Sequence, residues 1–257
     1  MKKKILSVCL LSVIAIMAIA GATLAYLTDT DKADNVFTIG NVQIELVEQQ
    51  RNDEGNGLEA FEPNKVLLPI VESAQGEKET VDGVAGLPTS KNYVDKIITV
   101  KNTGASDAYM RVYIAIPVVL DNVSDASQNI LHFNTTNASS ETGQWGLEKL
   151  VAQDVEVDVD NQKIQCNIYQ RTYTSVVEGG KTTKTPAYIG FYLDENVDNR
   201  MDGEKIIYTI NGTDINYDFS KGVTIPVFAV AVQADGFDSA DQAMSEAFGA
   251  NYNPWAK

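Results

Sequence analysis

The sequence has little histidine and little cysteine, and this scarcity removes several classes of site. Its 257 residues include one histidine, His132, and two cysteines. A zinc protease of the usual kind needs a His-Glu-x-x-His segment, and a serine hydrolase of the common fold needs a Gly-x-Ser-x-Gly turn. Neither pattern occurs, and no strand is followed by a phosphate-binding loop or a dinucleotide fingerprint. We therefore expect His132 to have a structural or surface role, and we expect the chain not to be an enzyme.

Positive charge is also scarce. The chain has 20 Lys and Arg against 35 Asp and Glu, which gives a formal net charge of −15. Nucleic-acid binding needs a cationic surface that displaces counterions, so this balance argues against it. Adsorption to anionic lipid is disfavoured for the same reason. An acidic chain suits a protein that stays soluble outside the cell, or one that binds cations.

The first forty residues have the layout of a secretory signal. Three lysines at residues 2–4 precede an uncharged run at residues 5–20, and then come small residues and a polar stretch. We expect residues 1–25 to be a signal helix that is removed. Two alternatives stay open, cleavage after Ala22 and an uncleaved N-terminal anchor, because the apolar run is close to the shortest membrane span. The residues that define the favoured cut are Thr23, Ala25 and Tyr26.

Export leaves the mature chain with a single cysteine. Cys9 lies inside the predicted signal, so Cys166 remains alone and no intramolecular disulfide can form. Cys166 alternates with Ile164 and Ile168, which predicts a buried, unreactive thiol on one face of a strand. The hydrophobic core alone must stabilise the exported protein.

Alternating apolar and polar residues predict an all-β fold. Val155, Val157 and Val159 alternate with acidic residues, and an Asp160-Asn161 turn leads into the next alternating stretch, which predicts a hairpin. About eight strands separated by turn signals indicate a jelly-roll-like β-sandwich rather than alternating strands and helices. The expected strands cover residues 42–46, 93–100, 108–120, 155–159, 164–168, 187–193, 204–210 and 223–233. Pro117 suggests that its strand bends or lies at an edge.

One helix and two long insertions complete the expected fold. Ser239 and Gln242 form a capping box, an apolar stripe follows, and Gly249 is a natural stop, so a short helix is expected near the C-terminus. Residues 52–90 are expected to be an insertion around one strand at residues 66–71. Residues 122–143 are rich in Ser, Asn and Thr, and we expect a mobile loop there.

An acidic run at residues 194–204 has oxygen-bearing side chains at alternate positions, a spacing that suits calcium. The candidate ligands are Asp194, Asn196, Asp198 and Asp202. The run departs from a calcium-binding EF-hand loop, because Asn199 stands where that loop needs glycine and Lys205 where it needs glutamate. The favoured interpretation is therefore a solvated hairpin loop without a cofactor, and calcium is the alternative.

Three segments of the sequence resemble the TasA/camelysin family of Gram-positive bacteria. The first is Gly-Ala-Thr-Leu-Ala-Tyr-Leu-Thr-Asp-Thr at residues 21–30, together with Asn-Val-Phe-Thr-Ile-Gly-Asn-Val at residues 35–42. The second is the Lys-Asn-Thr-Gly turn at residues 101–104, followed by Tyr-Met-Arg-Val at residues 109–112. The third is the apolar stretch at residues 225–234 with the helix after it. Members of this family carry signals that are cut by the dedicated peptidase SipW.

The resemblance implies a secreted structural protein of the biofilm matrix or cell surface. It implies a jelly-roll domain at residues 41–257, preceded by an extension at residues 26–40 that adds as a strand to a neighbouring copy or a related matrix protein. An exposed sheet edge can accept such a strand. The apolar anchors of the donor segment would be Tyr26, Leu27, Val36 and Phe37. A flexible leader without this role is the alternative for the same residues.

Two other functions compete with this interpretation. Camelysin members of the family are described as metalloproteases, although this chain has one histidine and no zinc motif. A secreted carbohydrate-binding module is the other, since jelly rolls often carry sugar sites. The aromatic residues that could stack on a sugar are Tyr109, Tyr113, Trp145, Tyr188 and Tyr192.

Overall fold

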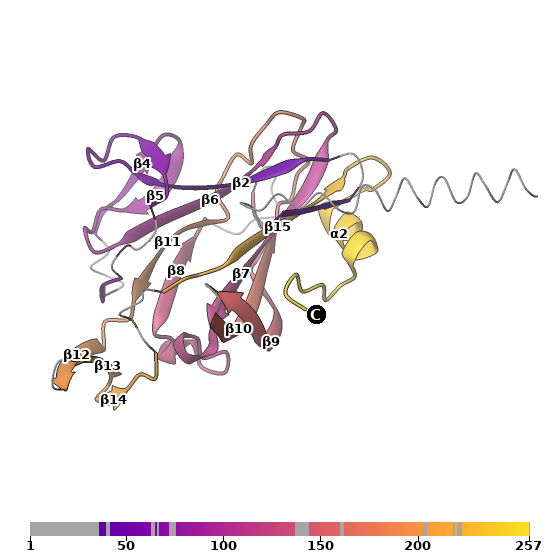
Figure 1. Cartoon of the computed structure of the whole chain (residues 1–257). Coiled ribbons are helices and arrows are strands. Elements are labelled where there is room, and N and C mark those ends of the chain that lie inside the picture. Colours follow the sequence, from indigo (N-terminus) through magenta and orange to yellow (C-terminus); the bar gives the residue numbers. More distant parts are fainter. Residues whose placement is uncertain are drawn as a thin grey trace, which may run out of the picture.

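The computed structural model describes residues 36–39, 42–62, 65, 67–71, 76–136, 144–159, 162–202, 205–217, 219 and 223–256. These residues form two five-stranded sheets packed on a shared core, two smaller sheets and a C-terminal helix (Figure 1). The prediction of an all-β, jelly-roll-like sandwich with a short C-terminal helix is confirmed. The predicted signal helix at residues 1–25 lies outside the described residues. No helix in the described ranges is long and apolar enough to cross a membrane.

The first large sheet, called sheet I here, has the strand order β1-β15-β7-β10-β9. Its strands are β1 (Val36–Ile39), β15 (Val227–Gln233), β7 (Ala108–Pro117), β10 (Gln162–Thr172) and β9 (Lys149–Val159). Sheet II has the order β3-β2-β6-β11-β8. Its strands are β3 (Leu58–Ala60), β2 (Ile44–Arg51), β6 (Val94–Asn102), β11 (Tyr188–Leu193) and β8 (Leu131–Thr135). Consecutive strands such as β6 and β7, or β10 and β11, cross between the sheets, as they do in a jelly roll.

The main core lies between the two sheets. Strand β7 is buried along its whole length because both of its faces are covered. Met110, Val112 and Ile114 face the core between the sheets. Tyr109 and Tyr113 face the other way and pack under helix α2 (Ala240–Phe248) and the residues after it. Apart from Arg111, the sequence of β7 is therefore apolar throughout and does not alternate.

Helix α2 forms as the sequence predicts. The Ser239 hydroxyl oxygen accepts a hydrogen bond from the backbone N–H of Gln242 at 3.2 Å. In return, the Gln242 side-chain oxygen accepts one from the backbone N–H of Asp238 at 3.1 Å. These two bonds satisfy N–H groups that the first turn leaves without helical partners. Gly249 ends the helix with φ of 88°, a conformation that glycine adopts without strain.

The predicted hairpin around Cys166 is also confirmed. Strands β9 and β10 pair antiparallel, with Val155 opposite Cys166 and Val157 opposite Ile164. The predicted turn residues, Asp160 and Asn161, lie outside the described residues. Cys166 is a free, fully buried thiol, and burial raises its pKa to about 12. The prediction that Cys166 is buried is confirmed, and a raised pKa disfavours the reactive thiolate.

Several predictions about loops are wrong, because segments without clear alternation still pair as strands. The insertion at residues 52–90 contains β3, β4 (Lys78–Val81) and β5 (Val84–Pro88). The expected strand at residues 66–71 is absent where it is described, and Pro69 makes only an isolated bridge to Leu193. The polar loop at residues 122–143 contains β8, whose partner is β11. Pairing with a neighbouring strand determines the conformation of these segments more than their own pattern of apolar and polar residues does.

The acidic run and Pro117 also differ from expectation. Residues from Val197 onward form strand β12 (Val197–Asp202), which pairs with β13 (Lys205–Ile210) and is followed by β14 (Thr213–Asp214). This small sheet lies at one end of the sandwich, beyond β8 and β11 (Figure 1). Pro117 ends strand β7, which is central in sheet I, so the edge interpretation is wrong and the bend is right. A short 3₁₀ turn, η2 (Val118–Leu120), follows it.

One buried arginine joins four segments of the chain. Arg171, on β10, is 1% exposed. Its guanidinium donates hydrogen bonds to the backbone oxygens of Gly146 at 3.0 Å and Thr136 at 3.1 Å, and to that of Ala187. A further, longer bond reaches the oxygen of Trp145 at 3.5 Å. The flat guanidinium, with its five N–H groups, satisfies carbonyls that no strand ladder covers.

A titrating carboxyl lies close to this arginine. Glu148 accepts a hydrogen bond from the Tyr188 hydroxyl at 2.9 Å. Burial raises the pKa of Glu148 to about 7, although that hydrogen bond and the positive charge of Arg171 act in the opposite direction. The folded protein therefore holds this proton more tightly than the unfolded chain, and its stability falls as pH rises through about 7.

Replacing Glu148 with glutamine is expected to stabilise the protein at neutral and alkaline pH, and much less in acid. Near pH 5 the native Glu148 is neutral, as glutamine is, so the melting temperature should be almost unchanged. Near pH 8.5 the wild-type chain must bury a charge, and the variant should be more stable by about 1–2 kcal/mol. Thermal unfolding of both proteins across this range measures the difference. An equal shift at both pH values would contradict the assignment to Glu148.

Candidate functional site: the N-terminal edge of the sandwich

The first described strand, β1, lies at an edge of sheet I. It pairs with β15 in parallel, with Val36 opposite Ala229 and Ile39 opposite Val232 (Figure 1). All other pairs in the two large sheets are antiparallel. Among the described residues β1 has no strand on its other side. It therefore presents a row of unpaired backbone groups, as any edge strand does.

Strand β15 is the surface that β1 covers. It is apolar on both faces, with Ala229 and Ala231 in the core between the sheets and Val230 and Val232 in the cluster under helix α2. Without β1, this strand would itself be the edge of sheet I. A long, apolar and exposed edge strand pairs readily with any available chain, so β15 needs a partner strand.

The two residues after the β1 connection, Val42 and Gln43, are anchored to the rest of the domain. Val42 is 4% exposed and belongs to the main core. The backbone oxygen of Gln43 accepts hydrogen bonds from the N–H groups of Thr103 and Gly104 at 2.8 and 3.1 Å. Gly40 and Asn41 connect β1 to this anchor in the sequence. Strand β1 therefore lies at the C-terminal end of the predicted extension at residues 26–40, next to the anchored start of the domain.

The opposite edge of sheet I, formed by β9, is less suited to pairing with an added strand. Strand β9 carries Asp154, Glu156 and Asp158, and its pairing with β10 is interrupted by a bulge. Charged residues and bulges are common devices that prevent edge pairing. The predicted extension at residues 26–40 is itself acidic, so like charges would meet along β9. The edge formed by β15 is the better candidate for assembly.

The predicted assembly residues divide into two groups. Tyr26 and Leu27 lie outside the described residues, as do Thr23 and Ala25 at the predicted cleavage site. Val36 and Phe37 fall on β1, where their backbones pair with Ala229 and Val230 of the same chain. The sequence does not identify β15 as the partner of β1. The apolar stretch of β15 is evident in the sequence, but periodicity alone does not reveal which strand pairs with which.

The four calcium candidates are not brought together. Asp194 accepts hydrogen bonds from the backbone and side chain of Asn196, both at 2.9 Å. Asp198 and Asp202 lie four residues apart on β12, a separation of about 13 Å along a strand. Calcium ligands lie within about 2.6 Å of the ion, so these two carboxylates cannot share one. The described residues contain no group of three or more His, Cys, Asp or Glu side chains that could hold a metal.

His132 and the aromatic candidates have structural partners. The His132 ring lies 3.0 Å from an Asp194 oxygen through Nε2 and stacks on Tyr192 with a centroid distance of 5.3 Å. This contact joins β8 to the start of the small sheet. The five aromatic residues considered for sugar stacking are all buried, which leaves them no open face for a ligand; they are Tyr109, Tyr113, Trp145, Tyr188 and Tyr192.

Comparison of the chain with protein-family models, with curated proteins and with solved structures finds no match in any of the three.

Proposed function

We propose that this chain is a secreted structural protein of the extracellular matrix or cell surface, and that its copies assemble through the N-terminal strand. The observation that carries the proposal is the parallel pairing of β1 with the apolar edge strand β15. The N-terminal export signal and the acidic, soluble composition are in keeping with it. The signal would be removed by a SipW-type peptidase, as the resemblance to the TasA/camelysin family implies.

Assembly requires only that β1 exchange its partner. In a single copy β1 covers its own β15, and in a polymer β1 of one copy would cover β15 of the next. The backbone hydrogen bonds and the register are the same in both cases, so the exchange costs little beyond the ordering of the connecting residues. The contact joins two different surfaces of the molecule. Repetition of such a contact extends into a filament unless the geometry closes a ring.

A disulfide between β1 and β15 is expected to abolish filament formation. Val36 and Ala229 are register partners, and neighbouring strands lie about 4.8 Å apart, within the range that a disulfide can bridge. The double variant Val36→Cys with Ala229→Cys would fix β1 to its own copy. Electron microscopy of the concentrated exported protein should show filaments from the parent chain and none from the oxidised variant. Reduction should restore them.

A matched control places the disulfide elsewhere. Asp158 and Lys163 are exposed register partners in the β9–β10 hairpin, and a disulfide between cysteines at these positions leaves β1 free. This control should form filaments when oxidised. Deletion of residues 26–39 should prevent filaments under all conditions. Filaments from the oxidised Val36–Ala229 variant would contradict strand exchange, and a parent chain that never polymerises would contradict assembly altogether.

A further inference from the structure

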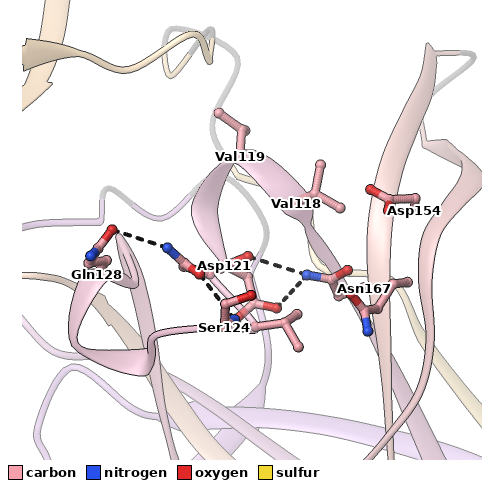
Figure 2. A pocket seen from close by; sticks show the side chains of 10 residues that line it. Val118, Val119, Asp121, Ser124, Gln128, Asp154 and Asn167 are labelled. Carbon is pink, nitrogen blue, oxygen red and sulfur yellow. Dashed lines mark hydrogen bonds between the residues drawn. The ribbon is translucent and has the colours of Figure 1, made fainter.

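A polar pocket lies away from the N-terminal edge, where sheet I meets the chain that follows β7. It has a volume of about 330 Å³. Its wall is formed by η2, by the loop at residues 121–124 and by the paired strands β9 and β10 (Figure 2). The pocket takes no part in the proposed exchange of β1.

Two buried side chains, Asp121 and Asn167, form the floor of the pocket. They are 6% and 3% exposed. The Asn167 amide donates to Asp121 Oδ2 at 2.8 Å (Figure 2). The Tyr169 hydroxyl donates to the same oxygen at 2.7 Å. The carboxylate fixes the orientation of the amide, because only its N–H₂ group can donate. Asn167 Oδ1 therefore points away from Asp121.

One oxygen of each floor residue is left for a ligand. Within the described residues, Asp121 Oδ1 and Asn167 Oδ1 accept no hydrogen bond. Neither is among the fully enclosed polar atoms that lack a partner, which are Tyr93 Oη and Gln170 Oε1. Both oxygens therefore reach the pocket that their residues line.

A β-bulge adds a second carboxylate to the wall. The register of β9 and β10 jumps from Val155 opposite Cys166 to Ala152 opposite Ile168. Asn167 therefore faces two residues, Gln153 and Asp154, instead of one. Asp154 has φ of 52°, a conformation that an aspartate holds at some cost. The bulge redirects this part of β9 so that Asp154 lines the pocket (Figure 2).

The pocket is negatively charged. Asp121 and Asp154 line it, no lysine or arginine does, and neither aspartate forms an ion pair within the described part of the chain. Two amides of the lining already donate to other side chains, Asn122 to Gln128 and Gln128 to Asp125. Such a site favours a ligand that carries positive charge and donates hydrogen bonds.

Part of the lining is apolar. It consists of the valines of η2 and its flanking loop, of which Val119 and Val123 are 36% and 37% exposed. These side chains can contact methylene groups while the carboxylates bind a charged head. A metal ion alone would not contact these valines.

We propose that this pocket binds a primary ammonium group carried on an aliphatic chain, as found in a free diamine or in a lysine side chain. The ammonium donates to Asp121 Oδ1 and Asn167 Oδ1, with Asp154 nearby, and the methylene groups lie along Val119 and Val123. The site is independent of strand exchange at β1.

Titration calorimetry of the purified protein tests the proposal with four probes: 1,5-diaminopentane, Nα-acetyl-lysine amide, 1,5-pentanediol and calcium chloride. The two ammonium probes are expected to bind at millimolar concentration or below, and the uncharged diol at least about tenfold more weakly. Tighter binding of the diamine assigns a free polyamine as the ligand. Tighter binding of the lysine amide assigns a lysine side chain of another protein.

Two variants and a control test the residues. Asp121→Asn preserves the shape of the floor and should weaken both ammonium probes about tenfold or more. Asp154→Asn removes an exposed charge that forms no ion pair in the described part of the chain. It should also weaken the binding of both ammonium probes. Asp198→Asn changes the net charge equally on distant β12 and should have no effect. Thermal unfolding establishes that each variant is folded.

Four outcomes would overturn the proposal: equal affinity for the diol, binding of calcium without binding of either ammonium probe, equal weakening by Asp198→Asn, or no binding of any probe at millimolar concentration.

Discussion

Replacement of Arg171 with methionine is expected to destabilise the protein by about 4 kcal/mol, because it leaves several buried carbonyls without a donor. Methionine fills much of the same volume but donates no hydrogen bond. The oxygens of Thr136, Gly146 and Ala187 would lose their partners where water cannot readily replace them. For a domain of this size the melting temperature should fall by about 10 °C. Chemical and thermal unfolding measure both quantities.

Lysine is the informative control at the same position. Arg171→Lys retains the positive charge but not the planar fork, so it can satisfy only part of the carbonyl set. Its loss of stability should lie between those of wild type and Arg171→Met. If methionine were as stable as wild type, the carbonyls would have found other donors, and the arginine would not be the element that joins these segments.

Replacement of Gly190 with alanine is expected to cost about 3 kcal/mol or more. A Cβ atom at this position would lie 2.4 Å from the Val94 backbone oxygen and 2.4 Å from the Tyr93 ring. Gly190 lies in β11, between β6 and β8, so there is no free side toward which the strand can move. Strands β6 and β11 would have to separate. Thermal unfolding should show a melting temperature lower by about 10 °C.

Gly57 provides the matched control for this substitution. A Cβ atom there would approach Asn52 Nδ2 at 3.2 Å, and that atom is the end of a side chain in a surface turn. Gly57→Ala should therefore change stability by less than about 1 kcal/mol. Similar losses for both variants would show that backbone entropy, and not the close approach of β6, sets the cost at Gly190.

Local patterns in the sequence predict the elements whose stability is local. The capping residues of helix α2 and the alternation around Cys166 both lie within a few positions of one another, and both predictions are confirmed. The eight expected strands each fall on an observed strand, with differences at the ends. The turn predicted at residues 101–104 also has a physical reason that the sequence hides. The buried Asn102 amide donates to the backbone oxygens of Ser106 and Val177 at 2.8 and 2.9 Å.

Features that depend on distant partners could not be predicted from the sequence. Strand β8 alternates over only five residues, Leu131–Thr135, within a stretch rich in polar residues, and it pairs with β11. The pocket floor joins Asp121 to Asn167, which the chain brings together from separate elements, and the bulge beside it has no sequence signal in Gln153 or Asp154. The parallel partner of β1 comes from the other end of the chain. Propensity does not encode such pairings.

The parallel pairing of β1 with β15 also sets an order of events during folding. The first described strand of the domain cannot take its place until one of the last strands has formed, because almost the whole chain separates them. Contacts between distant positions form slowly, since the loop between them must close first. Strand β1 is therefore expected to be the last part of sheet I to dock. During that interval a newly folded copy would present both an unoccupied β15 and an unattached β1. Under the proposed strand exchange, we therefore expect copies to join most readily at the end of their own folding.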